Sequence, residues 1–371
     1  MLECLAVRNY RTLHDFVIPL TSLNLVSGAN GTGKSNVYKA LRLLAETAQA
    51  GVVAALAREG GLQSALWAGA ADRGDGPVRL GLGFIGADYS YAIELGMPAP
   101  STSAFALDAV IKAETLWAGS QSAREGVLVE RRNAVARARG ANAKWELLHQ
   151  HLRGFDSMMS QLADPRRTPE LLGLREQVRS WRFYDHFRTD AGAPARWPQM
   201  GTHTPVLAAD GGDLGAALQT IREIGDGEAL DDAVADAFPG AKVIVDVHDG
   251  RFEPTMRQAG LLRPLRAAEL SDGTLRYLLW IAALLSPRPP ALLVLNEPET
   301  SLHPDLLPAL GRLIGRAAER TQVIVVSHAR RLIASIEAFD SFSLTLDKRF
   351  GETVVLEPAD FERPAWELFE H

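Results

Sequence analysis

The eight residues 28 to 35 constrain this chain more than any other stretch. They read Gly-Ala-Asn-Gly-Thr-Gly-Lys-Ser, which fits the pattern G-x-x-x-x-G-K-[ST] without a mismatch. Glycines let a loop wrap closely and aim its N–H groups at phosphate oxygens, and a helix that starts there adds its positive end. The apolar segment 23–26 precedes the loop, and apolar side chains recur at helical spacing after it. We therefore expect a strand, a phosphate-binding loop and a helix from Lys34 to about Ala48.

The loop offers the groups that a bound nucleotide needs. Lys34 places a positive charge beside the β- and γ-phosphates, and the hydroxyl of Ser35 is a ligand for Mg²⁺. The predicted nucleotide contacts are the loop residues and the asparagine that follows them: Asn30, Gly31, Thr32, Gly33, Lys34, Ser35 and Asn36.

A second group of motifs lies between residues 270 and 328. Ser271-Asp272-Gly273-Thr274 opens an apolar helix expected at 275–285, and a hydroxyl and a glycine at a helix start make a second anion site. The same four residues also fit a plain helix cap. Apolar segments at 291–295 and 322–326 resemble buried strands and flank an amphipathic helix at 306–318. This alternation predicts a parallel sheet covered by helices.

Taken in this order, the motifs resemble those of ABC-type ATPases of the RecF/SMC branch and the related OLD-like heads of bacteria. Residues 270–274 are similar to the ABC signature Leu-Ser-Gly-Gly-Gln, and 291–298 to a Walker B strand with its catalytic tip. Residues 299–304 resemble the D-loop, and 323–328 the strand that ends in the switch histidine. The resemblance covers roughly 1–50 and 260–335.

This resemblance implies an α/β fold: a P-loop NTPase with an ABC-type head, a mixed or parallel sheet covered by helices, and an inserted α+β lobe. The expected head is discontinuous, 1–50 and 240–371. Residues 51–239 form the lobe, which is partly integral to the head. The implied cofactors are ATP and Mg²⁺, and the implied partner is a second copy of the chain in an ATP-dependent, head-to-tail homodimer.

The resemblance also implies roles for single residues. Glu297 orients and polarises the attacking water, and His328 contacts the γ-phosphate or holds that water. Ser271 and Gly273 meet the γ-phosphate held by the second copy. Asn9-Tyr10-Arg11 is similar to the Asn-aromatic-Arg start of RecF-like heads, so Arg11 is a candidate nucleotide contact, with an ordinary surface residue as the alternative.

Two positions depart from the family pattern. Asn296 stands where Walker B has an aspartate that helps to hold Mg²⁺, so we expect a modest metal affinity or turnover. Asp272 brings a negative charge close to an anion site, which is unfavourable unless it turns away or caps its helix. Gln177 and Gln199 are both candidates for the Q-loop glutamine, and neither is assigned.

The rest of the chain predicts a mixture of strands and helices. We expect strands at 2–7, 16–20 and 242–247, and a hairpin formed by 78–85 and 89–95 that segments 105–117 and 126–138 extend. A stripe of apolar residues at helical spacing predicts a helix from Trp145 to about Leu162, and a second helix is expected at 170–179.

Composition narrows the partners. The chain has 371 residues, one cysteine and a net charge of -6, and it contains neither a signal-peptide pattern nor an apolar run of membrane-spanning length. We expect a cytoplasmic protein. Residues 110–200 hold 15 basic against 10 acidic residues, so this segment carries a positive surplus. A solvated surface with ion pairs is the favoured interpretation of this segment, and phosphate contacts are the alternative, for which the candidates are Arg131, Arg132, Arg137 and Arg139.

Two functions follow as alternatives. The first is a DNA-linked ATPase in repair, recombination or antiphage defence. The second is a nucleotide-switched regulatory protein that controls a separate effector protein, such as a nuclease, without binding DNA. The sequence has 43 residues after His328, so we expect no nuclease domain within it. The energising subunit of an ABC transporter is a weaker third alternative, because such chains usually lack so large a lobe.

Overall fold

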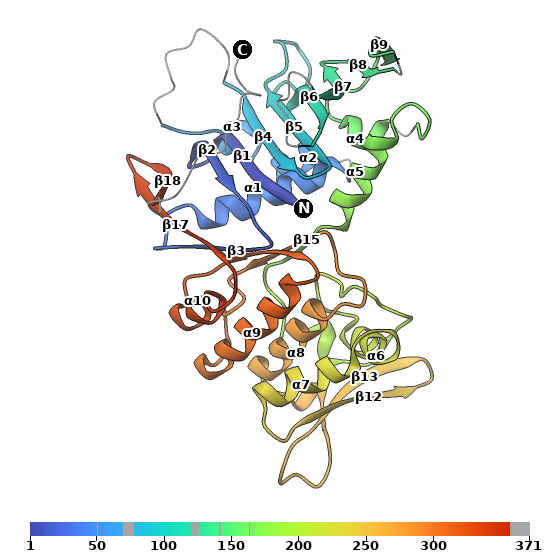
Figure 1. Ribbon diagram of the computed structural model, residues 1–371, viewed down its shortest axis with the longest axis vertical. Helices are drawn as coiled ribbons and strands as arrows, with labels where there is room; N and C mark the ends of the chain where they lie inside the picture. Colours follow the sequence, from blue (N-terminus) through green and yellow to red (C-terminus); the bar gives the residue numbers. More distant parts are fainter. Residues whose placement is uncertain (50, 70–77, 120–125, 141, 163, 357–371) are drawn as a thin grey trace. The chain divides into compact units, whose positions relative to one another are not determined.

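The structure is a computed structural model. It describes the whole chain except residues 50, 70–77, 120–125, 141, 163 and 357–371 (Figure 1). The chain forms two compact units. The first comprises residues 1–21, 26–181 and 344–371, and the second comprises residues 22–25 and 182–343.

An eight-stranded antiparallel sheet forms the first unit, in the order β2-β1-β4-β5-β6-β7-β8-β9. Helix α1 (Lys34–Thr47) lies against β1 and β4 and buries Val37, Leu41 and Leu44, as its apolar spacing predicts. The expected hairpin and its extension are confirmed. The strands are β1 (Leu2–Tyr10), β2 (Leu13–Pro19), β4 (Leu80–Gly86), β5 (Tyr89–Gly96), β6 (Val110–Ala118), β7 (Val127–Arg132), β8 (Val135–Arg139) and β9 (Trp145–His149).

Short helices complete this unit. Helix α2 (Val52–Arg58) and α3 (Leu62–Ala65) follow α1. Helix α4 (Met158–Gln161) contacts α5 (Pro169–Ser180), and the latter confirms the helix expected at 170–179.

The helix predicted from Trp145 to Leu162 is wrong. Trp145–His149 is strand β9, which pairs with β8, and only Met158–Gln161 is helical. A buried ion pair holds the segment between them in a non-helical path. Arg131 donates to the carbonyl of Arg153, and its partner Glu114 accepts from the backbone N–H of Met158 at 2.9 Å. These long-range bonds outweigh the local apolar spacing.

A six-stranded sheet has the order β10-β15-β16-β3-β17-β18, and the boundary between the units runs through β3 and β17. The pairs β10–β15 and β15–β16 are parallel, as the alternation of strand and helix predicts. Residues 292–295 are all buried, which accounts for their unbroken apolar run. The strands are β3 (Leu23–Gly28), β10 (Arg182–Tyr184), β15 (Leu292–Asn296), β16 (Gln322–Val326), β17 (Phe342–Arg349) and β18 (Glu352–Leu356).

Five helices and a small sheet build the rest of the second unit. Helix α8 (Asp272–Leu284) contacts α6 (Leu214–Ile224), α7 (Gly227–Ala237) and α9 (Leu307–Ala318), and α10 (Arg330–Ile336) packs on α9 (Figure 1). Their apolar faces share one core with β15 and β16. The small sheet contains β11 (Gln199–Met200), β12 (Lys242–His248), β13 (Arg251–Arg257) and β14 (Leu265–Arg266). The strand expected at 242–247 is thereby confirmed.

The units divide the chain at positions other than the expected boundaries at 50/51 and 239/240. Strand β1 pairs with β4, so residues after 51 continue the sheet that the N-terminus begins. Residues 182–239 belong with the second unit. Among the described residues, no helix is long and apolar enough to cross a membrane.

Candidate functional site

The loop between β3 and α1 has the backbone that its glycines predict. Gly28, Gly31 and Gly33 have φ values of 144°, 82° and 104°, which L side chains rarely adopt. A Cβ on Gly28 would lie 2.4 Å from the carbonyl oxygen of Leu346, and one on Gly33 would lie 2.0 Å from Oγ1 of Thr353. Gly31 has no such neighbour within 4 Å. Two of the glycines are therefore required by close packing, and the third faces open space.

The polar groups of this loop fit a phosphate. Lys34 is 5% exposed, and its Nζ donates to the carbonyls of Gly28 at 2.7 Å and Ala29 at 2.9 Å. Ser35 is exposed in the first turn of α1. Within the described part of the chain, the backbone N–H groups of Gly31 and Gly33 donate no hydrogen bond. Free N–H groups at a helix N-terminus, beside a lysine and a hydroxyl, are the donors that a phosphate and its cation require.

A chain of side-chain hydrogen bonds supports the loop from behind. Asn36 donates to the hydroxyl of Thr12 at 2.7 Å, and the Thr12 and Thr353 hydroxyls are 2.6 Å apart. Thr353 in turn donates to the carbonyl of Thr32 at 2.8 Å. Because the single hydroxyl proton of Thr353 goes to the carbonyl of Thr32, the Thr12 hydroxyl must donate to Thr353. The amide of Asn36 thus braces the loop, and its direct contact with a nucleotide stays a prediction.

Arg11 precedes Thr12 in the sequence, but its side chain pairs with Glu59. Its guanidinium pairs with Glu59 at 2.7 Å, and the hydroxyl of Tyr10 donates to the same carboxylate. Burial raises the pKa of Tyr10, so its hydroxyl stays protonated. The proposed contact of Arg11 with a nucleotide stays a prediction.

In the second unit, Glu297 follows β15 directly and lies beside the end of β16. Its N–H donates to the carbonyl of Val326 at 2.8 Å. Its φ is 48°, a left-handed value that costs a non-glycine residue free energy. Nδ1 of His328 lies 3.9 Å from Oε1 of Glu297, and both side chains are partly exposed. The two predicted catalytic side chains are therefore adjacent, with access to solvent.

Glu299 fixes the turn that carries His328. It is 8% exposed, and its Oε1 accepts from the hydroxyl of Ser327 at 2.7 Å and from the N–H groups of His328 and Ala329 at 3.0 and 3.2 Å. Nδ1 of His328 is 3.4 Å from the same oxygen. One buried carboxylate thus joins the segment after β15 to the end of β16, which limits the positions open to His328.

Asn296 ends β15 and contacts a carboxylate on the neighbouring strand. Its Nδ2 donates to Oδ1 of Asp185 at 2.8 Å. Asp185 follows β10, whose register places Tyr184 opposite Leu295, so the two side chains leave the same edge of the sheet. Oδ1 of Asn296 is buried and accepts no hydrogen bond from the described residues.

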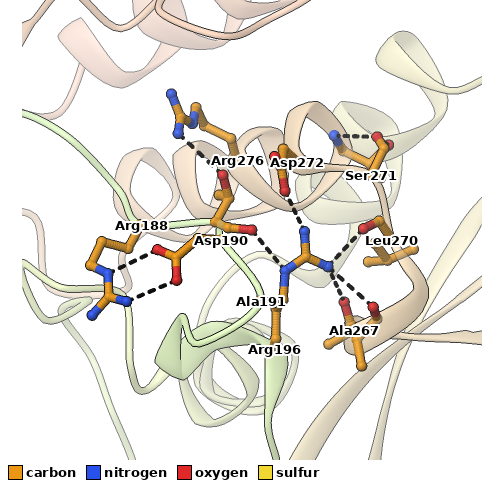
Figure 2. Close-up of polar contacts among 12 residues, drawn as sticks. Arg188, Asp190, Ala191, Arg196, Ala267, Leu270, Ser271, Asp272 and Arg276 are labelled. Carbon is orange, nitrogen blue, oxygen red and sulfur yellow. Dashed lines mark hydrogen bonds and ion pairs between the residues drawn. The ribbon is translucent and has the colours of Figure 1, made fainter.

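The signature segment, residues 270–274, begins helix α8. Ser271 is the N-cap, and its hydroxyl accepts from the N–H of Thr274 at 3.1 Å. Gly273 faces the D-loop, since a Cβ there would lie 3.5 Å from the carbonyl oxygen of Ser301. Asp272 turns to the guanidinium of Arg196 (Figure 2), which offsets its charge at this helix start. The helix cap is thus present, and the role of Ser271 and Gly273 in binding an anion stays a prediction.

Two buried arginines hold this segment. Figure 2 shows Arg196 against the turn before α8, where it donates to the carbonyls of Ala267 and Leu270 at 3.2 and 2.8 Å. On α8, Arg276 donates to the carbonyl of Thr300 at 2.6 Å and to that of Phe187 at 3.0 Å. Burial lowers the pKa of Arg276 while the nearby Asp272 carboxylate opposes that shift, and an arginine stays charged at neutral pH. The signature helix and the D-loop are therefore tied to the loop after β10.

Sequence reasoning missed four of these side chains: Asp185, Arg196, Arg276 and the bonding role of Glu299. Glu299 carried a weak signal, a second acid two residues after Glu297. The other three act through contacts with distant segments, for which no local pattern exists.

These features define a P-loop fold of the ABC/SMC-head type. A family model matches residues 23–334, and the chain belongs to the family described as "AAA domain, putative AbiEii toxin, Type IV TA system". No curated protein matches the sequence significantly.

A solved structure supports the same fold. The structure of an SMC head bound to the C-terminal winged-helix domain of ScpA aligns with a TM-score of 0.51 and 15% identity, covering 96% of this chain and 97% of that one. The SMC head domain from Thermotoga maritima has a TM-score of 0.47 at 15% identity, with 96% and 98% coverage. An SMC head from Pyrococcus furiosus, also bound to a ScpA domain, has 0.48 at 13%, with 96% and 95% coverage.

Proposed function

We propose that this chain binds and hydrolyses ATP with Mg²⁺, and that two copies pair head to tail around the nucleotide. The observation that carries the proposal is the Glu297–His328 pair, 3.9 Å apart at the end of β15 and β16, with Glu297 held at a left-handed φ. A solvent-accessible carboxylate beside a histidine can orient a water molecule and accept its proton.

Each residue has a task in this proposal. Lys34 and the free N–H groups of the glycine loop bind the phosphates, and Glu297 orients a water and accepts its proton while His328 stabilises the developing charge. Ser35 and Asn296 hold Mg²⁺, which neutralises charge on the β- and γ-phosphates when bound. Ser271 and Gly273 of the second copy bind the γ-phosphate from their own helix start.

ATP then acts as a switch. The γ-phosphate favours the paired state only by the contacts that it makes there and not in the separate copies, and hydrolysis removes them. The tie between the signature helix and the D-loop through Arg276 supports such a switch, because both segments would meet the second copy as one body.

We further propose a role in antiphage defence or DNA repair, because the family's description names a putative toxin of a toxin–antitoxin system. The arginine-rich stretch gives this proposal limited support. Arg131 is fully buried against Glu114, and Arg137 pairs with Glu130 and stacks on Trp145. Arg132 and Arg139 are exposed on the same sheet.

The burial of Arg131 favours the second candidate, a nucleotide-switched regulator of a separate effector protein. Retention on DNA that falls steeply with salt supports the first role. Co-purification of a protein partner without nucleic acid supports the second.

The activity itself is tested with Glu297→Gln. We expect kcat for ATP hydrolysis to fall at least about 100-fold, since the amide cannot accept the proton, while size exclusion with ATP and Mg²⁺ shows a trapped dimer. The native chain should show specific activity that rises with protein concentration.

Glu319→Gln is the matched control, because Glu319 is exposed after α9 and its side chain has no partner among the described residues. Activity independent of concentration in the native chain, or full activity in Glu297→Gln, contradicts the proposal.

A further inference from the structure

The register of β10 and β15 places a carboxylate beside Asn296. These parallel strands pair Tyr184 with Leu295, so the next residues, Asp185 and Asn296, are neighbours at the carboxyl edge of the sheet. In parallel α/β sheets, ligands bind at this edge. Asp185 is exposed there, and its only hydrogen bond among the described residues is the one it accepts from Asn296 at 2.8 Å.

The amide of Asn296 has one orientation that chemistry permits. Nδ2 must face the Asp185 carboxylate, because an amide oxygen there would set two acceptors against each other. Oδ1 therefore points elsewhere, and it is buried with no donor among the described residues. A buried carbonyl oxygen without a donor costs free energy unless an ion or water occupies its lone pairs.

The pair offers what a hard cation needs. Mg²⁺ binds oxygen ligands and is typically held by one or two carboxylates together with phosphates and water. Asn296 alone offers a neutral oxygen, whereas Asp185 and Asn296 together offer an amide oxygen and a full negative charge within one hydrogen-bonded unit. The charge absent from the end of β15 is thus present one strand away.

We propose that Asp185 supplies the carboxylate of the divalent-cation site that Asn296 lacks. This inference rests on the proposed ATPase function and deepens it. It also replaces the expectation that Asn296 weakens metal affinity: the total charge of the site is kept, and its location is moved from β15 to the end of β10.

The test compares four full-length chains: native, Asp185→Asn, Asn296→Asp and the swap Asp185→Asn/Asn296→Asp. Binding of a fluorescent ATP analogue is measured against Mg²⁺ concentration, and Mn²⁺ binding is followed by electron paramagnetic resonance. We expect Asp185→Asn to raise, at least about tenfold, the Mg²⁺ concentration at which analogue binding is half-maximally enhanced. The swap should restore the native value, because it returns the negative charge to the carboxyl edge of the sheet.

Asp190→Asn is the control, since Asp190 lies five residues on and pairs with the exposed Arg188. Unchanged metal dependence in Asp185→Asn overturns the inference and leaves Asp185 a hydrogen-bond partner of Asn296. Failure of the swap to recover what Asp185→Asn loses also overturns it. The same titration, begun in EDTA, separates the two proposals. If the native chain binds no nucleotide analogue either in EDTA or at any Mg²⁺ concentration, the proposed function itself has failed.

Discussion

At the scale of single residues, several backbone positions of the candidate site are closely packed or strained. Gly28 and Gly33 leave no room for a side chain, and Glu297 and Ser301 hold left-handed φ values of 48° and 61° without being glycine. Such strain persists only where the surrounding structure imposes it. Glu299 and the N–H of Glu297 impose it here, by fixing the segment after β15 to the end of β16.

Two of the three loop glycines, Gly33 and Gly31, allow the effect of this close packing to be measured. Gly33→Ala puts a Cβ 2.0 Å from Oγ1 of Thr353 and forces a φ of 104° on alanine, so the Thr12–Thr353–Thr32 chain must shift. We expect the free energy of unfolding to fall by about 3 kcal/mol or more, as strain and lost hydrogen bonds add.

Gly31→Ala is the matched control, because its Cβ meets nothing within 4 Å and only the φ of 82° is strained. Its expected loss is about 1–2 kcal/mol. Urea unfolding of both variants without nucleotide checks the order, and equal losses would show that the threonine chain does not support the loop.

At the scale of elements, the sequence predicts what local order determines. The loop at 28–35, the apolar strands β15 and β16 and the amphipathic α9 follow from motif and periodicity, because each buries a face that its own residues define. The structure of residues 145–162 could not be predicted in this way. The residues that determine its path, Glu114 and Arg131, lie at least 14 residues earlier in the sequence. The role of Arg196 could not be predicted for the same reason, because Arg196 lies 76 residues from its partner Asp272.

The turn before α8 depends on Arg196, whose side chain is 8% exposed. Arg196→Met keeps the bulk of the side chain but removes the guanidinium that donates to the carbonyls of Ala267 and Leu270, and it leaves Asp272 unpaired. We expect the free energy of unfolding to fall by about 2–4 kcal/mol, and ATP-dependent dimerisation to weaken more than ATP binding, because the signature segment loses its position.

Arg188→Met is the matched substitution in the same loop, where Arg188 pairs with Asp190 and both side chains are more than half exposed. Such an exposed pair is screened by solvent and contributes little to stability. Denaturation curves and size exclusion with ATP compare the two variants; a dimer of normal affinity in Arg196→Met would show that the turn is not needed for pairing.

At the scale of the whole molecule, the motifs are divided between the two units. The glycine loop belongs to the first unit, and Glu297, His328 and the signature segment belong to the second. A chain of this organisation carries every motif once, whereas a head-to-tail pair combines the loop of one copy with the signature segment of the other. The proposed dimer therefore predicts that each site takes its glycine loop from one chain and its signature segment from the other.

Mixing two inactive variants tests whether each site is shared between two chains. Lys34→Ala removes the phosphate-binding charge, and Ser271→Arg obstructs the start of α8, so each variant alone should be nearly inactive. In a mixed dimer, the loop of Ser271→Arg meets the signature segment of Lys34→Ala, and one of the two sites is complete. With equal amounts and free exchange, half the dimers are mixed, so about a quarter of the native rate should return. The double variant mixed with either single variant has no complete site and should restore nothing. Recovery in the first mixture alone requires the signature segment to act on the other copy's nucleotide, and no recovery in either means that each chain completes its site by itself.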